Sequence, residues 1–266
     1  MRKILFIILF LNTLIYAKIA VIVSILPEVT FVKKIGGDKV DISLMVKPGN
    51  SPHTYEPKPS QMRNISKADL YLSIGVEFEN IWLRKFQNIN KKMLIKDISK
   101  GIKKYNNNPH IWTTPTNVKK IALNIFHELS NIDTKNKKYY KTNLEKFLDE
   151  IDEVDKKIRE ILKNVKPKSY FMVFHPAWGY FAKEYNLTQL PIEIDGKKPK
   201  PKELTKLIKL AKKYRVKAIF TQPEFSDQSA KLIAKELGIE VIKISPLNPN
   251  WSKTLLKLAN AIGGNN

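Results

Sequence analysis

Short apolar runs and amphipathic segments alternate along the first part of the chain. Residues 19–25 and 70–73 are apolar and rich in β-branched or aromatic side chains, as in buried strands. The predicted strands are residues 19–25, 40–46, 70–73 and 92–98, and the predicted helices between them are residues 28–35, 61–67 and 79–86. Strands that alternate with helices in this way indicate βαβ units and a parallel sheet.

The pattern then changes to one long helical period. After a predicted helix over residues 116–130, residues 138–166 contain no proline or glycine, and their apolar positions recur mostly at steps of three and four. Such a segment of about 29 residues predicts one amphipathic helix roughly 43 Å long. A coiled-coil partner helix is the alternative, but a rigid connection between two lobes fits better, because Pro167 ends the helix and the βαβ alternation then resumes.

In the last part of the chain, predicted strands again alternate with predicted helices. Its predicted strands are residues 170–174, 187–193, 216–220 and 240–244, and its predicted helices are residues 177–185, 201–214, 227–237 and 251–261. The sequence therefore predicts an α/β protein of two βαβ lobes, each a mostly parallel sheet with flanking helices, joined by one long rigid helix. The expected ranges are 18–137 for the N-terminal lobe, 138–166 for the linking helix and 167–266 for the C-terminal lobe.

Residues 1–17 have the pattern of a secretory signal peptide. Arg2 and Lys3 form a basic start, residues 4–15 are almost entirely apolar, and Ala17 offers a cleavage site before Lys18. The alternative is an uncleaved membrane anchor, but the apolar run is shorter than the ~20 residues that a membrane-spanning helix needs. Since the chain has no cysteine, a lipid-anchored lipoprotein is not expected, and the prediction is a soluble periplasmic protein without disulfides or thiolate ligands.

The chain is strongly basic. Without Arg2 and Lys3, 45 basic residues face 25 acidic ones, which gives a formal charge of +20. Such a charge can indicate nucleic-acid binding, but export argues against that partner, and the lysines are spread along the whole chain. We therefore interpret them as solvated surface charge, with attraction to anionic lipids as the weaker alternative.

Three of the four histidines lie in short, proline-flanked segments outside the helical patterns, namely His53, His110 and His175. The fourth, His127, lies within the helix predicted over residues 116–130 and is expected on its surface. His53 and His175 each follow a predicted strand, where open α/β sheets bind their ligands. Three neutral imidazoles that converge would bind zinc or a neighbouring transition metal.

Other familiar sites are missing. The chain has no HExxH pair, no glycine-rich phosphate loop with its lysine, and no GxSxG nucleophile turn. A three-histidine zinc hydrolase or hydratase is the alternative from another class, but no second acid–base pair accompanies the histidines, and we predict a protein that is not an enzyme. A third hypothesis, binding of an organic ligand or metal chelate, would need aromatic or arginine clamps. The chain has few arginines, and Trp112 and Trp178 lie close to histidines, where we expect them to pack rather than to bind a chelate.

The histidine segments resemble those of a known family. Segments that carry the resemblance are PHTYEPKPS (52–60), SKAD (66–69), GVEFE (75–79), PHIW (109–112) and FHPAWGYF (174–181). Their order and spacing are similar to the metal-ligand blocks of the zinc/manganese solute-binding proteins of bacterial ABC importers, over essentially the whole mature chain. The resemblance implies a two-lobed fold with little hinge motion, a metal ion between the lobes, an integral-membrane permease with a cytoplasmic ATPase as partner, and a monomeric state.

The chain departs from this family where a fourth ligand is expected. Ser245 stands where the family usually has an aspartate, and QPEF (222–225) replaces the usual EPQF. Either a water molecule completes the shell of the three histidines, or a displaced carboxylate does, with Glu224 as the candidate and Glu56 as a weaker one. The alternative for Glu224 is an ordinary acid at a helix start or on the surface.

The donor set favours zinc over manganese as the transported ion. Imidazole suits zinc, whereas manganese prefers oxygen donors, and copper or nickel would also bind three imidazoles in vitro. In this family a glutamate at the position of His175 is associated with manganese, which agrees with zinc here. The sequence thus predicts a high-affinity periplasmic zinc carrier that serves a permease, with manganese as the alternative cargo.

Overall fold

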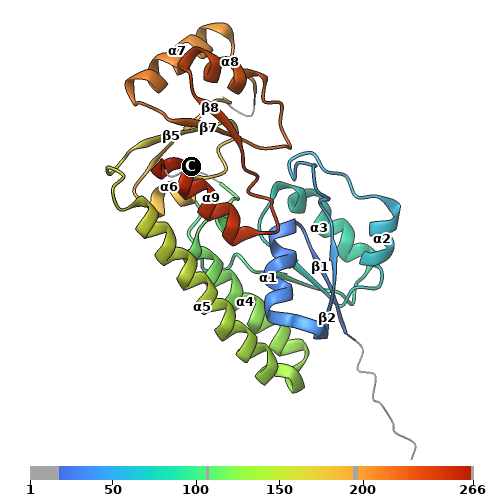
Figure 1. Ribbon diagram of the computed structural model, residues 1–266. Coiled ribbons are helices and arrows are strands. Elements are labelled where there is room, and N and C mark those ends of the chain that lie inside the picture. Colours follow the sequence, from blue (N-terminus) through green and yellow to red (C-terminus); the bar gives the residue numbers. More distant parts are fainter. Residues whose placement is uncertain (1–17, 106–107, 194–196, 265–266) are drawn as a thin grey trace, which may run out of the picture.

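The computed structural model describes residues 18–105, 108–193 and 197–264. Within these ranges the chain forms two four-stranded parallel sheets with flanking helices, and the predicted α/β fold class is confirmed (Figure 1). The strands of the first sheet are β1 (Ile19–Val23), β2 (Val40–Leu44), β3 (Leu70–Ser73) and β4 (Leu94–Asp97). Those of the second are β5 (Tyr170–Val173), β6 (Thr188–Pro191), β7 (Ala218–Thr221) and β8 (Glu240–Lys243). The predicted signal peptide lies outside the described residues.

The helices fall close to their predicted ranges. They are α1 (Leu26–Gly36), α2 (Pro59–Ile65), α3 (Glu77–Ile89), α4 (Pro115–Ile132), α5 (Lys137–Leu162), α6 (Gly179–Glu184), α7 (Pro201–Lys213), α8 (Gln228–Leu237) and α9 (Trp251–Gly263). Several start at a proline, whose fixed φ suits the first turn of a helix. The largest difference is at the end of α5, which stops at Leu162 rather than at Lys166. No helix in the described part of the chain is both long and apolar enough to span a membrane.

Both sheets have the same strand order. The first runs β2-β1-β3-β4 and the second β6-β5-β7-β8, and every pairing is parallel. In the register of the first sheet, Val21 lies opposite Ile42 on one side and Leu70 on the other. In each sheet the two central strands, β1 and β3 or β5 and β7, connect to strands on opposite sides. The loops that follow the two central strands therefore run apart at the carboxyl end of the sheet, and ligands of such sheets usually bind in the crevice between these loops.

The long helix α5 is an integral part of the core. It packs against α4, α1 and α9, and α4 and α5 run side by side along one side of the molecule (Figure 1). The buried side chains of α5 recur at three- and four-residue steps, as predicted: Tyr140, Leu144, Phe147, Ile151, Val154, Ile158 and Leu162. The main apolar cluster includes residues of both sheets, so the two lobes share one core, while a smaller cluster lies under α7 and α8.

The C-terminal helix also joins the lobes. The Trp251 ring, at the start of α9, packs edge-on against Phe31 of α1 with the ring centroids 6.0 Å apart. Its Nε1 donates to the carbonyl of Trp112 at 2.7 Å, while Trp112 Nε1 donates to the carbonyl of Pro246 at 2.8 Å. Both indoles are buried, so each of these hydrogen bonds satisfies a donor that water cannot reach. The two tryptophans therefore hold the lobes in a fixed relation.

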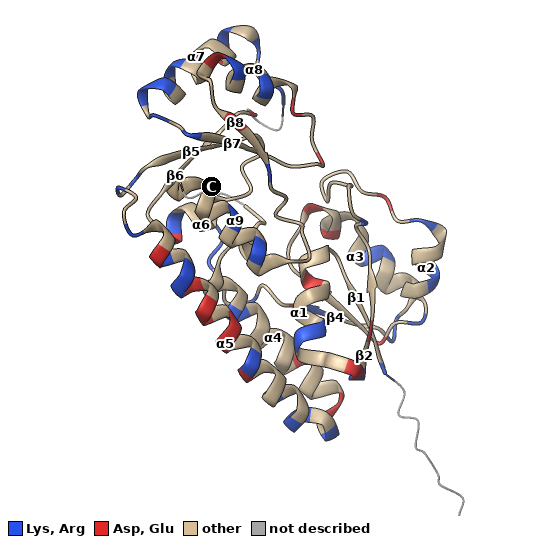
Figure 2. Cartoon of the chain, viewed as in Figure 1, with Lys and Arg blue, Asp and Glu red and all other residues tan. Residues whose placement is uncertain are grey.

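The basic side chains cover the outside of both lobes. Figure 2 shows lysines and arginines on the helices of each lobe, interspersed with acidic residues along α5. Several of these charges form exposed pairs, such as Lys34 with Glu150 at 2.6 Å and Arg159 with Asp155 at 2.9 Å. This distribution agrees with solvated surface charge rather than with a single basic binding stripe.

Replacing Trp251 should test the contact between the lobes. The side chain is 6% exposed, so Trp251→Ala removes a large buried ring and leaves the carbonyl of Trp112 without its donor. We expect the free energy of unfolding to fall by about 3–5 kcal/mol, measured by urea denaturation followed by circular dichroism. Leu232→Ala on α8, where the side chain is 59% exposed, is the control and should change it by less than about 0.5 kcal/mol. Equal losses of unfolding free energy in Trp251→Ala and Leu232→Ala would contradict the role of Trp251 in holding the lobes together.

Candidate metal centre

Loops at the carboxyl ends of both sheets bring three histidines together. His53 lies in the loop between β2 and α2, His110 in the segment between β4 and α4, and His175 directly after β5. The first two belong to the first lobe and the third to the second lobe. The prolines predicted to restrict these segments are neighbours of the histidines in each case, at Pro52, Pro109 and Pro176.

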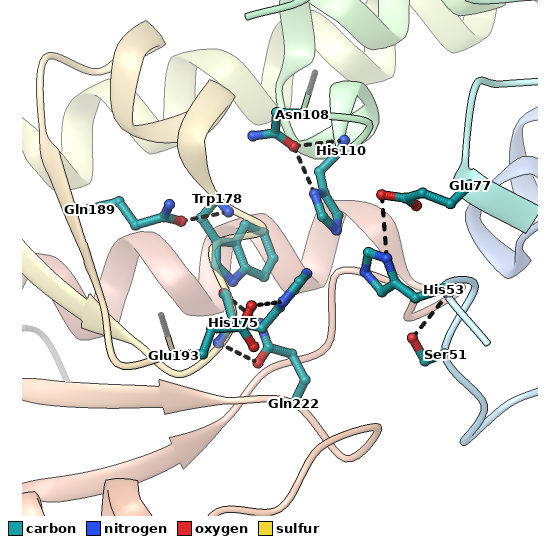
Figure 3. Close-up of polar contacts among 10 residues, drawn as sticks. All are labelled: Ser51, His53, Glu77, Asn108, His110, His175, Trp178, Gln189, Glu193 and Gln222. Atoms are coloured by element: carbon teal, nitrogen blue, oxygen red, sulfur yellow. Dashed lines mark hydrogen bonds and ion pairs between the residues drawn. The ribbon is translucent and has the colours of Figure 1, made fainter. Parts of the chain in front are cut away.

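The three imidazole rings form a compact triangle. The centroids are 6.4 Å apart for His53 and His110, 5.2 Å for His53 and His175, and 5.1 Å for His110 and His175 (Figure 3). One nitrogen from each ring lies within 4.8 Å of the others. Two nitrogens that bind a tetrahedral zinc ion at ~2.0–2.1 Å are about 3.4 Å apart. The rings therefore need only small shifts to bind one ion together.

His110 and His175 are fixed through their Nδ1 atoms. The Nδ1 of His175 lies 2.8 Å from Glu193 Oε1, and the Nδ1 of His110 lies 2.7 Å from Asn108 Oδ1. Since these oxygens accept hydrogen bonds, each Nδ1 carries the hydrogen and each Nε2 keeps its lone pair. The Nε2 of His175 is buried and has no hydrogen-bond partner among the described residues. Metal-binding histidines commonly have this arrangement, in which one ring nitrogen donates to an acceptor that orients the ring and the other nitrogen is left to bind the metal.

His53 has a looser partner. Its Nδ1 lies 3.3 Å from Glu77 Oε1, at the start of α3. The ring is also the most accessible of the three, since the His53 side chain is 33% exposed, whereas His110 and His175 are buried. His53 thus forms the open side of the cluster.

Aromatic side chains pack against the two buried histidines. The His175 ring stacks on Phe225 with the centroids 4.6 Å apart, and His110 lies beside Trp112 at 5.3 Å. Together with the loops they line a small cavity beside the histidines. Apolar walls keep water away from the two buried rings and strengthen their interactions with any ion that they bind. Trp112 therefore takes the packing role that the sequence suggested.

The pKa values of the histidines are shifted in opposite directions. Burial, and then the positive charges of His175 and His53, hold the pKa of His110 well below its ordinary value. The hydrogen bond that the His53 ring donates to Glu77, more than any other contact, raises the pKa of His53. For Glu77 itself burial acts to raise the pKa, but the contact with His53 and a backbone hydrogen bond outweigh it, so the pKa of this carboxyl is lowered and it is ionised at neutral pH.

Of the two acids predicted as a fourth ligand, only Glu224 lines the cavity. Its Oε1 accepts a hydrogen bond from Ser245 Oγ at 2.8 Å, and it does not belong to the tight cluster of the three histidines. Glu56 is exposed and does not line the cavity. Ser245, which stands where the family usually has an aspartate, therefore donates a hydrogen bond to the carboxylate of Glu224.

Gln222 supports the loop of His175 from both ends of its amide. Its Nε2 donates to the carbonyl of His175 at 3.1 Å, and its Oε1 accepts from the backbone N–H of His175 at 3.4 Å. A glutamate could only accept, so an amide is the residue type that these two contacts require.

Sequence reasoning missed three residues that contact the histidines: Glu77, Asn108 and Glu193. Glu77 and Glu193 follow strands β3 and β6, and this position at a strand end was the available signal. Asn108 stands two residues before His110. Its Oδ1 also accepts a hydrogen bond from the backbone N–H of His110 at 3.0 Å, a turn contact that asparagine commonly makes.

The shifted pKa values predict an order of protonation. In protein stripped of metal, His53 should take up its proton above the ordinary pH of about 6.5, and His110 only well below it. Because metal binding requires neutral imidazoles, metal affinity should start to fall as the pH drops through the raised pKa of His53. NMR titration of the imidazole resonances, assigned with His53→Gln and His110→Gln, measures both values. The opposite order of protonation would contradict the described contacts.

Known proteins match this chain over most of its length. A crystal structure of ZnuA superposes with a TM-score of 0.89 at 40% identity, covering 94% of this chain and 99% of that one. The "High-affinity zinc uptake system protein ZnuA" of Bacillus subtilis is 29% identical over 256 residues, which cover 86% of this chain and 79% of the relative. The "Manganese ABC transporter substrate-binding lipoprotein PsaA" of Streptococcus mitis is 29% identical over 236 residues, 82% of this chain and 76% of the relative.

The family assignment rests on a match that includes all three histidines. The sequence model described as "Zinc-uptake complex component A periplasmic" matches residues 21–262, which contain all the loops at the cavity and both sheets apart from the first two residues of β1. The resemblance found in the histidine segments is thereby confirmed. The chain belongs to the family of periplasmic component A of zinc-uptake complexes.

Proposed function

We propose that this protein binds one divalent transition metal ion in the periplasm, with zinc as the preferred ion, and delivers it to an ABC permease driven by a cytoplasmic ATPase. The observation that carries the proposal is the convergence of three imidazole nitrogens within 4.8 Å of one another in a chain of the zinc-uptake family. The ion is cargo, bound and released unchanged.

The proposed ligands are His53, His110 and His175. Their chemistry suits zinc, because neutral imidazoles bind this ion well and the two buried rings are already oriented by acceptors at Nδ1. The buried Nε2 of His175 supports the assignment, since an imidazole nitrogen without a partner gains a bond when it binds a metal. Glu224 and a water molecule remain the fourth ligands proposed from the sequence.

Zinc is favoured over manganese by the donor set. The cluster consists of three nitrogens, whereas manganese prefers sites rich in oxygen donors. The relatives include both a zinc uptake protein and a manganese lipoprotein, so family membership alone supports either ion. The preference for zinc therefore rests on the three histidines.

A hydrolytic zinc site has less support. The family is one of solute-binding transport components, and the two carboxylates Glu193 and Glu224 are each engaged by a side chain, His175 and Ser245. A general base must reach a metal-bound water, and neither of these two acids is free to do so. The third acid beside the cluster, Glu77, contacts His53. We propose that the protein has no enzymatic activity, and turnover of an ester or of carbon dioxide by the zinc-loaded protein would oppose this.

The remaining predictions concern the state of the protein in the cell. Periplasmic residence agrees with the family, while a form without a lipid anchor stays a prediction based on the absence of cysteine. A monomeric state and the absence of nucleic-acid binding also stay predictions.

Replacing each proposed ligand should abolish tight zinc binding. We expect His53→Ala, His110→Ala and His175→Ala each to weaken zinc affinity by at least about 100-fold, or about 2.8 kcal/mol, because each removes one of three nitrogen donors. Competition with a chromophoric zinc chelator measures the affinity, and circular dichroism checks that each variant is folded.

His127→Ala is the matched control for these variants. This histidine lies on the exposed face of α4, where it contacts Glu128 and Asn131, and its loss should leave zinc affinity unchanged. Absence of tight zinc or manganese uptake by the unaltered protein would oppose the whole proposal.

A further inference from the structure

Glu77 carries a buried oxygen without a partner beside the three histidines. Its Oε2 is buried and forms no hydrogen bond within the described ranges, and the Nε2 of His175 is in the same condition. Both residues line the same small cavity. Leaving a buried, ionised oxygen unpaired costs free energy, which a cation in this cavity would remove. The acid and the imidazole thus offer an anionic oxygen and a lone pair to the same space.

The contact between Glu77 and His53 is the weakest of the three that hold the histidines. It measures 3.3 Å, whereas Glu193 and Asn108 lie 2.8 and 2.7 Å from their rings. A charge-assisted hydrogen bond is usually 2.7–2.9 Å long. Glu77 is therefore held less firmly than Glu193, and its carboxylate can turn at small cost.

The other acids near the cluster are less suitable as ligands. Glu193 contacts the Nδ1 of His175, on the side of the ring away from its free Nε2. Glu224 accepts the hydroxyl of Ser245 and would have to give up that bond. Among the described carboxylates that line this cavity, Glu77 and Glu224, only Glu77 has an oxygen that is both buried and unpaired.

The backbone that carries Glu77 is firmly placed. Glu77 is the first residue of α3, where the helix dipole favours a negative charge. The preceding turn is held by the buried Glu79, whose carboxylate accepts the N–H groups of Ile74 at 2.9 Å and Gly75 at 2.7 Å. Figure 3 shows Glu77 pointing from the start of this helix toward His53. The backbone of Glu77 is therefore fixed, and only its side chain can rotate in response to an ion in the cavity.

We propose that Glu77 is the fourth ligand of the metal ion, in place of Glu224 or water. The carboxylate lies outside the tight cluster, so it reaches the ion by a rotation of its own side chain away from His53 Nδ1. Three neutral imidazoles leave a bound dication with a charge of +2, and the single carboxylate lowers it to +1. This assignment rests on the proposed function and adds an oxygen donor from the first lobe to the three nitrogens.

A zinc-loaded crystal structure tests the assignment directly. We expect one Glu77 oxygen at ~2.0–2.2 Å from an ion located by anomalous scattering above the zinc edge. A water molecule or Glu224 at that position, with Glu77 still on His53, would overturn the proposal.

Two substitutions at Glu77 separate a ligand from a residue that only orients His53. Glu77→Gln keeps an oxygen that can accept from His53 Nδ1 but removes the charge, and Glu77→Ala removes both. If Glu77 is a ligand, both variants lose at least about 10-fold in zinc affinity, or about 1.4 kcal/mol, and both change the visible absorption bands of the cobalt(II)-loaded protein. If Glu77 only orients His53, Glu77→Gln behaves as the unaltered protein, and the proposal fails.

The controls also keep this inference apart from the proposed function. Glu240→Gln makes the same chemical change at an exposed position on β8 and should alter neither measurement. Cobalt bands that respond to Glu224→Gln and not to Glu77→Gln would assign the ligand to Glu224 and overturn the inference alone. Failure of the unaltered protein to bind zinc would instead oppose the proposed function.

Discussion

The site depends on the fixed orientation of rings that come from separate lobes. An acceptor at one imidazole nitrogen fixes the tautomer and aims the lone pair of the other nitrogen, and here Glu193 and Asn108 supply that acceptor to the two buried rings. The ring of His175 belongs to the second lobe and that of His110 to the first. Their spacing is therefore only as constant as the relation between the lobes.

That relation is set by contacts far apart in the sequence. The hydrogen bonds of Trp112 and Trp251 cross between the lobes next to His110, and α5 packs against helices of the first lobe and against α9. Turning one lobe against the other would break two buried hydrogen bonds, and each donor left unpaired costs about 1–3 kcal/mol. The same contacts that build the core thus keep the three nitrogens within reach of one ion.

The sequence predicted the elements well because strands and helices leave different periods in the pattern of apolar residues. It also singled out His53, His110 and His175, since histidine is scarce and their segments match a family pattern. The acceptors of these histidines could not be predicted. Glu77 and Glu193 are 24 and 18 residues from the histidines they contact, and only the order and register of the strands bring them together. Likewise, the apolar stripe of α5 predicted that one face of this helix is buried, but its sequence could not predict that α1, α4 and α9 are the helices that cover it.

The two departures from the family pattern are related in space. Gln222 uses both ends of its amide on the backbone of His175, and Ser245 donates to the carboxylate of Glu224. The hydroxyl of Ser245 donates one hydrogen bond to the acid at position 224, so the two departures from the family pattern form a donor–acceptor pair. This pair occupies the side of the cavity formed by the second lobe and leaves the first lobe, with Glu77, as the source of an oxygen donor.

The spread of basic residues over both lobes has a consequence for the rate at which metal arrives. A chain with a net charge of +22 repels an approaching dication, and at low ionic strength this repulsion reaches across the whole surface. At 0.15 M salt the Debye length is only ~8 Å, so a cation at the cavity responds mainly to the nearby carboxylates. Added salt should therefore speed the capture of the ion, the reverse of what is found where electrostatic attraction guides a ligand to its site.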